Sequence, residues 1–245
     1  MKTTVITANC LRHKAFLKML CDNIDVTSVI IENKKCSSDD FIFNKEMNYF
    51  GEYSDYKSLS STFECEIGNV NNQNIENIIK KDNPDIIFVF GCSILKSNIF
   101  SIPTKGCINI HTGIVQLFRG VDSSFWAIHD KKPEGIGATI HYVDDSIDAG
   151  NIICQRRPLL SFDDGFSDLF MKSCKCGFDL LKDNLNYIID GKISKVSISE
   201  RGKLYNKRDL TSINFDKAND NIKEVLSNYI LNKEQVDKEI KIIEG

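Results

Sequence analysis

Residues 106–150 read GCINIHTGIVQLFRG, VDSSFWAIHDKKPEG and IGATIHYVDDSIDAG in consecutive blocks. The first block holds Asn109 and His111 two positions apart in an apolar run of strand composition, so both side chains leave the strand on the same face. The third block ends in Asp148-Ala-Gly, a turn sequence that suits a carboxylate held in a tight loop. The stretch therefore predicts an amide, an imidazole and a carboxylate that converge at one end of a sheet.

Composition limits the kinds of partner. The chain has 245 residues, of which 42% are hydrophobic, enough for one moderate domain or a domain with an appendage. Its 31 Lys+Arg against 34 Asp+Glu give a net charge of −3, whereas nucleic-acid binding depends on an excess of clustered basic residues. No apolar run approaches the roughly 18 residues that span a bilayer, and no signal peptide is recognisable. We expect a soluble, cytoplasmic protein without nucleic acid or membrane as its partner.

The nine cysteines form no regular framework and lie mostly inside apolar runs. This distribution is typical of reduced thiols in a cytoplasm. Cys174 and Cys176 form the only close pair, and no second Cys or His pair stands at ligand spacing. We therefore expect no metal site.

Apolar runs of strand type alternate with helical patterns, which predicts an α/β fold: a Rossmann-like, mostly parallel mixed β-sheet flanked by helices. The runs expected to be strands are 3–7, 26–31, 62–67, 85–90, 106–111, 137–143 and 151–158. The helical patterns begin at residue 11 and cover 72–81, 121–130 and 163 to about 190.

Two features of this pattern indicate ligand binding. Arg12, His13 and Lys14 open the first helix at the carboxyl end of the first strand, where open α/β sheets bind ligands and a helix N-terminus favours phosphate. A solvated first helical turn is the alternative. The strand at 85–90 stops at Gly91, which lets the backbone come close to a ligand or simply turn sharply into a helix.

The remaining segments are less regular. Residues 32–61 are polar with interleaved aromatic residues and form either a lid with a short helix or an irregular loop region. We expect a loop at 112–120, a hairpin at 192–205 and one or two amphipathic helices after Phe215. Residues 1–195 are predicted to be the catalytic domain, and 196–245 an extension whose apolar residues form a homodimer surface or fold back on the same subunit. Those apolar residues are Val225, Leu226, Ile230 and Leu231.

Several common site motifs are absent. The sequence contains no G-x-x-x-x-G-K-[ST], no G-x-G-x-x-G after the first strand, no H-E-x-x-H and no G-x-S-x-G. A dinucleotide or P-loop site is therefore not expected despite the α/β pattern.

A family resemblance rests on the order and spacing of four short motifs. They are Asn109-x-His111, Arg119-Gly120, Gly137-x-Thr139-x-His141 and Asp148-x-Gly150. In this order they closely resemble the folate-dependent formyltransferases, whose fold is shared by glycinamide ribonucleotide transformylase and the catalytic domain of methionyl-tRNA formyltransferase. The resemblance covers roughly residues 1–195. It implies a catalytic triad of Asn109, His111 and Asp148, with N10-formyltetrahydrofolate as co-substrate and no metal.

The resemblance also assigns binding residues. Those matching the folate contacts are Gly91, Ser93, Ile94, Leu95, Val143, Asp144, Asp145 and Ile147. Those assigned to the acceptor substrate are Arg12, His13, Lys14, Thr112, Gly113, Arg119 and Gly120.

The subfamily is inferred from the residues after His111, which differ from those of the ribonucleotide and tRNA enzymes. The ribonucleotide and tRNA enzymes have Ser-Leu-Leu-Pro there, whereas Gly113 and the ending Phe118-Arg119-Gly120 look more like nucleotide-sugar N-formyltransferases. Those enzymes usually keep a proline where this chain has Gln116. The resemblance implies formyl transfer to the 4-amino group of a nucleotide-linked 4-amino-4,6-dideoxy sugar for O-antigen or another surface polysaccharide. Of the common acceptors we prefer dTDP-4-amino-4,6-dideoxyglucose, and GDP-perosamine is the alternative.

Other functions remain open. The chain could be a glycinamide ribonucleotide transformylase, although the missing Ser-Leu-Leu-Pro speaks against it. It could also be a non-catalytic nucleotide-sugar or folate-binding module, although binding alone does not need Asn109, His111 and Asp148 together. Hydrolysis of formyl-folate, with water replacing the amine, is a further alternative.

Overall fold

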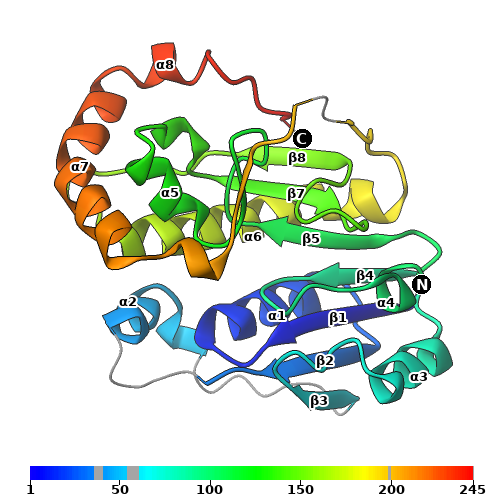
Figure 1. The fold of residues 1–245 in the computed structure, drawn as a ribbon. Helices are drawn as coiled ribbons and strands as arrows, with labels where there is room; N and C mark the ends of the chain where they lie inside the picture. The colour runs from blue at the N-terminus through cyan, green and yellow to red at the C-terminus, as the bar shows by residue number, and fades with distance from the viewer. Residues whose placement is uncertain (36–40, 54–60, 198–199, 245) are drawn as a thin grey trace. The chain divides into compact units, whose positions relative to one another are not determined.

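The structure is a computed structural model (Figure 1). It describes residues 1–35, 41–53, 61–197 and 200–244. Contacts divide the chain into two compact units. The first comprises Met1–Ile110, Tyr142–Ser146 and Leu181–Ile193, and the second His111–His141, Ile147–Leu180 and Ser194–Gly245.

A seven-stranded sheet with the order β3-β2-β1-β4-β5-β7-β8 confirms the α/β prediction. Its strands are β1 (Thr3–Ala8), β2 (Ser28–Asn33), β3 (Thr62–Glu66), β4 (Ile86–Val89), β5 (Cys107–His111), β7 (Ala138–Tyr142) and β8 (Ile152–Arg156). The pairs β1–β2, β1–β4, β2–β3 and β4–β5 are parallel, whereas β7 and β8 are antiparallel. The expected strands are therefore present, with ends shifted by a few residues.

Along the sequence, the helices alternate with these strands, and the last of them lie in the C-terminal part of the chain. The α-helices are α1 (Leu11–Asn23), α2 (Phe41–Phe50), α3 (Gln73–Asp82), α4 (Ser97–Phe100), α5 (Ser123–His129), α6 (Phe166–Ile189), α7 (Ser212–Leu231) and α8 (Lys233–Val236). Short 3-10 turns are η1 (Gly51–Tyr53), η2 (Pro133–Gly135) and η3 (Lys207–Asp209). The lid predicted within residues 32–61 lies partly outside the described residues. None of the described helices is long and apolar enough to cross a bilayer.

The core of the first unit joins its strands to α3. Asn72 caps α3 by accepting from the Ile75 amide at 2.8 Å, and the helix ends at Asn83 in the left-handed region with φ 51°. Ile75 and Ile79 therefore point from one helix face into a cluster of apolar residues from β1, β2 and β4.

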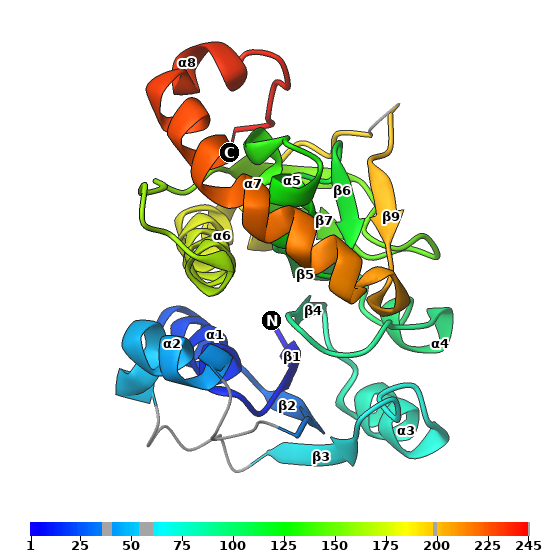
Figure 2. The same cartoon turned by 60° about the vertical axis from the view of Figure 1, so that its left-hand side comes forward.

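The core of the second unit joins α5 to α7. Helix α7 lies beside α5 (Figure 2). Val225 and Leu226 of α7 are 5% and 1% exposed, in one cluster with Phe125 and Trp126 of α5. These two residues thus fold back on their own subunit, which was one of the two alternatives. Leu231 remains 74% exposed, and the homodimer stays a prediction.

Two local expectations are wrong. Residues 203–205 form no hairpin with the preceding segment: β9 (Lys203–Tyr205) pairs in parallel with β6 (Phe118–Gly120). The expected loop at 112–120 therefore ends in a strand. Both errors have one cause, because the hydrogen-bonding partner of each three-residue segment lies far away in the sequence.

The cysteines are mostly free. Cys21, Cys65, Cys92, Cys107, Cys154, Cys174 and Cys176 are free thiols. Cys10 is disulfide-bonded, so the expectation of reduced thiols is wrong for this residue.

Candidate active site

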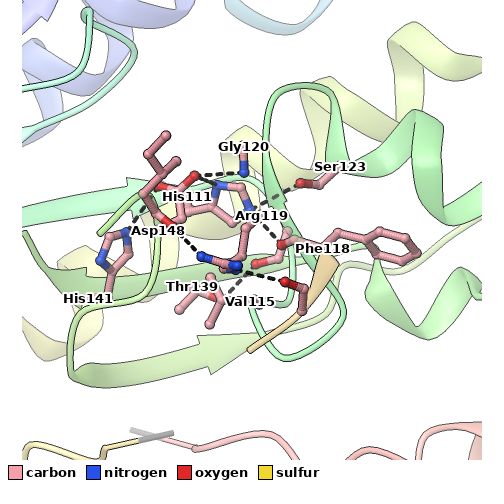
Figure 3. A network of polar contacts seen from close by, with 12 residues as sticks. His111, Val115, Phe118, Arg119, Gly120, Ser123, Thr139, His141 and Asp148 are labelled. Carbon is pink, nitrogen blue, oxygen red and sulfur yellow. Dashed lines mark hydrogen bonds and ion pairs between the residues drawn. The ribbon is translucent and has the colours of Figure 1, made fainter. Parts of the chain in front are cut away.

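His111 ends β5, and its side chain is 5% exposed. Both ring nitrogens face oxygen atoms (Figure 3). Nδ1 lies 3.2 Å from Oδ2 of Asp148, and Nε2 lies 3.1 Å from the Phe118 carbonyl oxygen and 3.1 Å from Oγ of Ser123. A carboxylate and a carbonyl can only accept hydrogen bonds, so this arrangement favours an imidazolium that donates from both nitrogens.

The electrostatic surroundings of His111 act in opposite directions. Burial lowers the pKa of His111, while the Asp148 charge, the hydrogen bond to Asp148 and the hydrogen bond to the Phe118 carbonyl raise it. Arg119 adds a smaller effect that lowers it. The attractive interactions outweigh burial, and the pKa of His111 is raised above its ordinary value.

Asp148 lies in the connection between the antiparallel strands β7 and β8, as predicted from the sequence. Its backbone adopts φ 46°, a left-handed conformation that aspartate tolerates better than most residues. The Gly120 amide donates to Oδ2 at 2.9 Å, and Nε2 of His141 lies 3.5 Å from Oδ1. Burial raises the pKa of Asp148, but His111 and His141 outweigh it and hold that pKa well below its ordinary value.

Asn109 precedes His111 on β5 and is in register with Val89 of the neighbouring strand β4. Alternate residues of a strand project to the same face, so the predicted amide and imidazole belong to one face of one strand. Asn109 is half-buried.

Thr112 and Gly113 follow His111 directly. A Cβ atom at Gly113 would lie 2.8 Å from Nε2 of His111 and 2.6 Å from Cβ of Ser123, so a larger residue cannot enter without displacing the imidazole. The Thr139 hydroxyl donates to the Gly113 carbonyl at 2.7 Å. Gly113 therefore has a packing role beside His111, and its predicted contact with substrate remains a prediction.

Gln116 is held by a reciprocal pair of amides. Its Nε2 donates to Oε1 of Gln155 at 2.9 Å, and Nε2 of Gln155 donates back to Oε1 of Gln116 at 2.6 Å. Gln155, on β8, also donates to Oγ1 of Thr139 and accepts from the Ile243 amide. Side-chain hydrogen bonds thus fix the loop at the position where a proline was expected.

Arg119 and Gly120 lie on β6 beside Asp148. Nη1 of Arg119 donates to the Ile147 carbonyl at 3.0 Å, and its Nε donates to the Gly202 carbonyl at 2.8 Å. Gly120 has φ 87°, and a Cβ atom there would lie 2.1 Å from the Tyr205 carbonyl oxygen. Both predicted substrate residues are therefore engaged with the protein itself, and a contact with substrate remains a prediction.

Gly91 begins a tightly held loop in the first unit. It has φ 68°, and a Cβ atom there would lie 2.3 Å from Nε2 of His13. Nζ of Lys34 donates to the Gly91 carbonyl at 2.6 Å. The fully buried Glu32 carboxylate accepts from the Ser93 amide at 2.8 Å and from the Ser93 hydroxyl at 3.0 Å.

Ile94 and Leu95, the next two residues assigned to folate, differ in exposure. Ile94 is 66% exposed, whereas Leu95 is 6% exposed and belongs to the core of the first unit. The loop thus combines a backbone that is held in place with the exposed apolar side chain of Ile94.

The other predicted folate segment is a surface turn after β7. The Val143 amide donates to the Cys107 carbonyl at 2.8 Å, and Oδ1 of Asp144 accepts from the Ser146 amide. Asp144 and Asp145 are exposed, while Ile147 is half-buried.

The basic cluster at the start of α1 is also engaged. Arg12 forms an ion pair with Glu46 at 3.0 Å, and its backbone amide donates to the same carboxylate oxygen at 2.7 Å. His13 is 1% exposed, and burial, with smaller effects of Arg12 and Lys34, holds its pKa well below the ordinary value. Lys14 is half-buried. Their predicted role in substrate binding is untested.

Sequence reasoning missed several residues that support the site. Ser123 contacts His111, Gln155 fixes Gln116, and Glu32 fixes the loop after β4. Ser123 and Gln155 gave no signal, because they lie far along the chain from their partners. An acidic residue directly after the apolar run at 26–31 was the available signal for Glu32.

A family model described as Formyl transferase matches residues 24–177, more than half of the chain. Curated relatives include the methionyl-tRNA formyltransferase of Lysinibacillus sphaericus, 39% identical over 109 residues that cover 44% of this chain and 34% of that protein. That of Kosmotoga olearia is 32% identical over 143 residues, 56% of this chain and 46% of that protein. The chain thus spans between a third and a half of the length of these relatives.

Solved structures share the fold. A sugar N-formyltransferase from Shewanella sp. superposes with a TM-score of 0.64 at 19% identity, covering 89% of this chain and 86% of that one. An N-formyltransferase from Helicobacter canadensis in complex with folinic acid and dTDP-3-aminofucose gives 0.58 at 18%, covering 86% and 73%. A phosphoribosylglycinamide formyltransferase from Anaplasma phagocytophilum gives 0.58 at 18%, covering 84% and 98%.

Proposed function

The chain belongs to the formyl transferase family, and from this premise we propose that it transfers the formyl group of N10-formyltetrahydrofolate to a primary amine. The observation that carries the proposal is the His111 imidazole, with Nδ1 at 3.2 Å from the Asp148 carboxylate and Nε2 at 3.1 Å from the Phe118 carbonyl. This environment raises the pKa of His111 above its ordinary value and so favours the protonated ring in a largely water-excluded place. A buried cation of this kind suits a reaction in which negative charge develops on oxygen.

In the proposed reaction the amine attacks the formyl carbon, and the carbonyl oxygen gains negative charge. The two donors assigned to that oxygen are the Asn109 amide and the Nε2 hydrogen of the His111 imidazolium, which exchanges the Phe118 carbonyl for the substrate while Nδ1 stays paired with Asp148. The bond from the formyl carbon to the folate nitrogen then breaks, and that nitrogen receives a proton from His111 while the amine loses one through water to Asp148. The products are a formamide and tetrahydrofolate, and the proton taken up by Asp148 passes through water to the His111 ring, which restores the starting state of both residues.

The structure of the residues after β4 supports the proposal of a folate co-substrate. Glu32 and Lys34 hold the backbone from Gly91 to Ser93, and Ile94 presents an exposed apolar side chain beside it. A fixed backbone offers amides and carbonyls to the polar edge of a pterin ring, while an apolar side chain contacts its face. These features support binding at this loop.

We propose that the acceptor is a nucleotide-linked 4-amino-4,6-dideoxy sugar, with dTDP-4-amino-4,6-dideoxyglucose preferred and GDP-perosamine as another, used for O-antigen or a related surface polysaccharide. Support comes from Gly113 with the ending Phe118-Arg119-Gly120, and from a fold shared with sugar N-formyltransferases, one of them in complex with a dTDP-amino sugar. The fold alone does not select this acceptor, because a phosphoribosylglycinamide formyltransferase superposes almost as well.

The test is a release assay for tetrahydrofolate with N10-formyltetrahydrofolate and a panel of amines. The panel contains dTDP-, UDP- and GDP-linked 4-amino sugars, glycinamide ribonucleotide and methionyl-tRNA, together with a reaction that lacks any amine. We expect a formylated nucleotide sugar, identified by mass spectrometry, and separate Asn109→Ala and His111→Ala variants that bind both substrates but lose about 10²–10³ in kcat.

Each other outcome changes one part of the proposal. Turnover of only glycinamide ribonucleotide or methionyl-tRNA would refute the acceptor class. Tetrahydrofolate release without an amine would indicate hydrolysis. Wild-type turnover in either alanine variant would remove the mechanism.

A further inference from the structure

Arg119 joins two segments that are far apart in the sequence. Its Nε donates to the Gly202 carbonyl at 2.8 Å, and its Nη1 donates to the Ile147 carbonyl at 3.0 Å. One planar guanidinium thus bridges the C-terminal part of the chain and the residue directly before Asp148.

The segment at Gly202, which accepts one of the two hydrogen bonds from Arg119, is held by several contacts. The Gly202 amide donates to the Val115 carbonyl at 3.0 Å, and the following residues form β9, which pairs with β6. The Tyr205 ring stacks on Trp126 with centroids 3.8 Å apart and an interplanar angle of 5°. Gly202 needs to be glycine, since a Cβ atom there would lie 2.3 Å from the Leu117 carbonyl carbon. The segment is therefore a rigid anchor for the guanidinium.

The other end of the bridge is a turn that needs support. Asp148 has a positive φ and belongs to no strand, so the ladder between β7 and β8 does not fix it. The Gly120 amide donates to the Asp148 carboxylate, and Arg119 donates to the carbonyl of Ile147, the residue directly before Asp148. Gly120 and Arg119 are consecutive residues of β6, and Phe118 before them accepts from His111. Three consecutive residues of β6 therefore contact the His111–Asp148 pair or its immediate neighbour.

We propose that Arg119 is a positioning residue, which ties the Ile147–Asp148 turn to the C-terminal segment at Gly202 and so sets the distance between Asp148 and His111. The proposal rests on the proposed function for its effect on turnover. It assigns the C-terminal segment a part in the active site, in addition to any part in assembly. The family resemblance implies instead that Arg119 binds the acceptor substrate, and the two roles predict different behaviour of a lysine variant.

The experiment compares Arg119→Lys, Arg119→Gln and the control Arg208→Gln. Lysine keeps the charge but has a single ammonium group, which cannot reproduce the planar fork that reaches two carbonyls. Glutamine removes both charge and fork. Arg208 is an exposed arginine in η3, so its substitution controls for the loss of one charge near the C-terminal segment.

Two readouts separate the roles. Steady-state kinetics measure kcat and the KM of each substrate, and NMR follows the imidazole titration of the four histidines in the free protein, with His111 assigned from a His111→Asn variant. The titration needs no turnover, so it tests the positioning role even where the proposed reaction is wrong. Thermal melting identifies any variant that does not fold.

The positioning role requires that both Arg119 variants lose roughly 10–100-fold in kcat with KM values within about threefold of wild type. The Arg119→Lys variant should also show a lower pKa of His111, because Asp148 is no longer held against it. Arg208→Gln should match the wild type in both readouts. An unchanged His111 titration in folded Arg119→Lys would overturn the proposal. So would a KM for the nucleotide sugar that rises in Arg119→Gln and recovers in Arg119→Lys, because that pattern belongs to a residue that binds phosphate by its charge.

Discussion

Replacing Asp148 by asparagine tests the charge interaction at the centre of the candidate site. Oδ2 of Asp148 lies 3.2 Å from Nδ1 of His111, and both side chains are largely buried. At an effective dielectric constant of about 20, two opposite unit charges at this distance attract each other by ~5 kcal/mol. Asparagine keeps the size and an accepting oxygen but removes the charge, so burial then dominates and lowers the pKa of His111. We expect the neutral imidazole to be favoured over the imidazolium and kcat to fall about 10²–10⁴-fold.

The assay is the pH dependence of kcat/KM for the wild type and Asp148→Asn, together with the NMR titration of His111. The basic limb of the profile should move to lower pH in the variant, and the variant should regain part of its activity as the pH falls. Asp163→Asn, a change at an exposed carboxylate, serves as the matched control. An unshifted basic limb together with an unchanged His111 titration would refute the reasoning.

The same pair gives a stability window. The pKa of His111 is raised above 6.5, so its contribution is complete below that pH and is lost as the pH rises through the folded value. The pKa of Asp148 is lowered below 3.8, so its contribution is complete above that pH and is lost as the pH falls through the folded value. Urea unfolding should therefore show the largest difference between wild type and Asp148→Asn between pH 3.8 and 6.5. A difference that is constant with pH would contradict this.

Three further substitutions test supporting contacts. Gly113→Ala should lower kcat roughly 10–100-fold with little change in KM, because the added Cβ displaces the imidazole; normal kinetics would contradict the packing seen. Glu32→Gln should raise the Kd for tetrahydrofolate roughly tenfold in calorimetry, because a glutamine amide cannot accept all three hydrogen bonds that the Glu32 carboxylate accepts. The control Glu66→Gln, at an exposed carboxylate, should leave the Kd unchanged. Equal Kd values for Glu32→Gln and the wild type would exclude a role of Glu32 in folate binding. Gln155→Leu should lower the free energy of unfolding by about 1–3 kcal/mol, and adding Gln116→Leu should recover part of that loss; additive losses would argue against the amide pair.

Strand and helix positions followed from the sequence wherever apolar periodicity was strong. The runs at 85–90 and 106–111 became β4 and β5, and the pattern at 72–81 became α3 with its Asn72 cap. The prediction failed for β6 and β9, which have three residues each and show no periodicity. Their pairing is a contact between residues far apart in the chain, which no local pattern encodes.

The candidate site divides in the same way. Residue types and spacing singled out Asn109, His111 and Asp148, because two residues share a strand face and the third occupies a turn sequence that favours a carboxylate. The surroundings that hold them could not be predicted, since Ser123 and Gly120 approach from other elements. The partners of Arg119 could not be predicted either, because the Gly202 and Ile147 carbonyls lie far along the chain from it.

The sequence by itself thus determined the α/β class, the order of most elements and the identity of the chemical groups, because these depend on local periodicity and residue type. Only the tertiary structure decided that both nitrogens of His111 face acceptors, that Gln116 is held by Gln155 in place of a proline, and that the C-terminal segment at Gly202 reaches Arg119. The physical reason is that hydrogen-bond partners and the electrostatic environment of a buried group are set by distances between residues remote in sequence, which arise only when the chain packs.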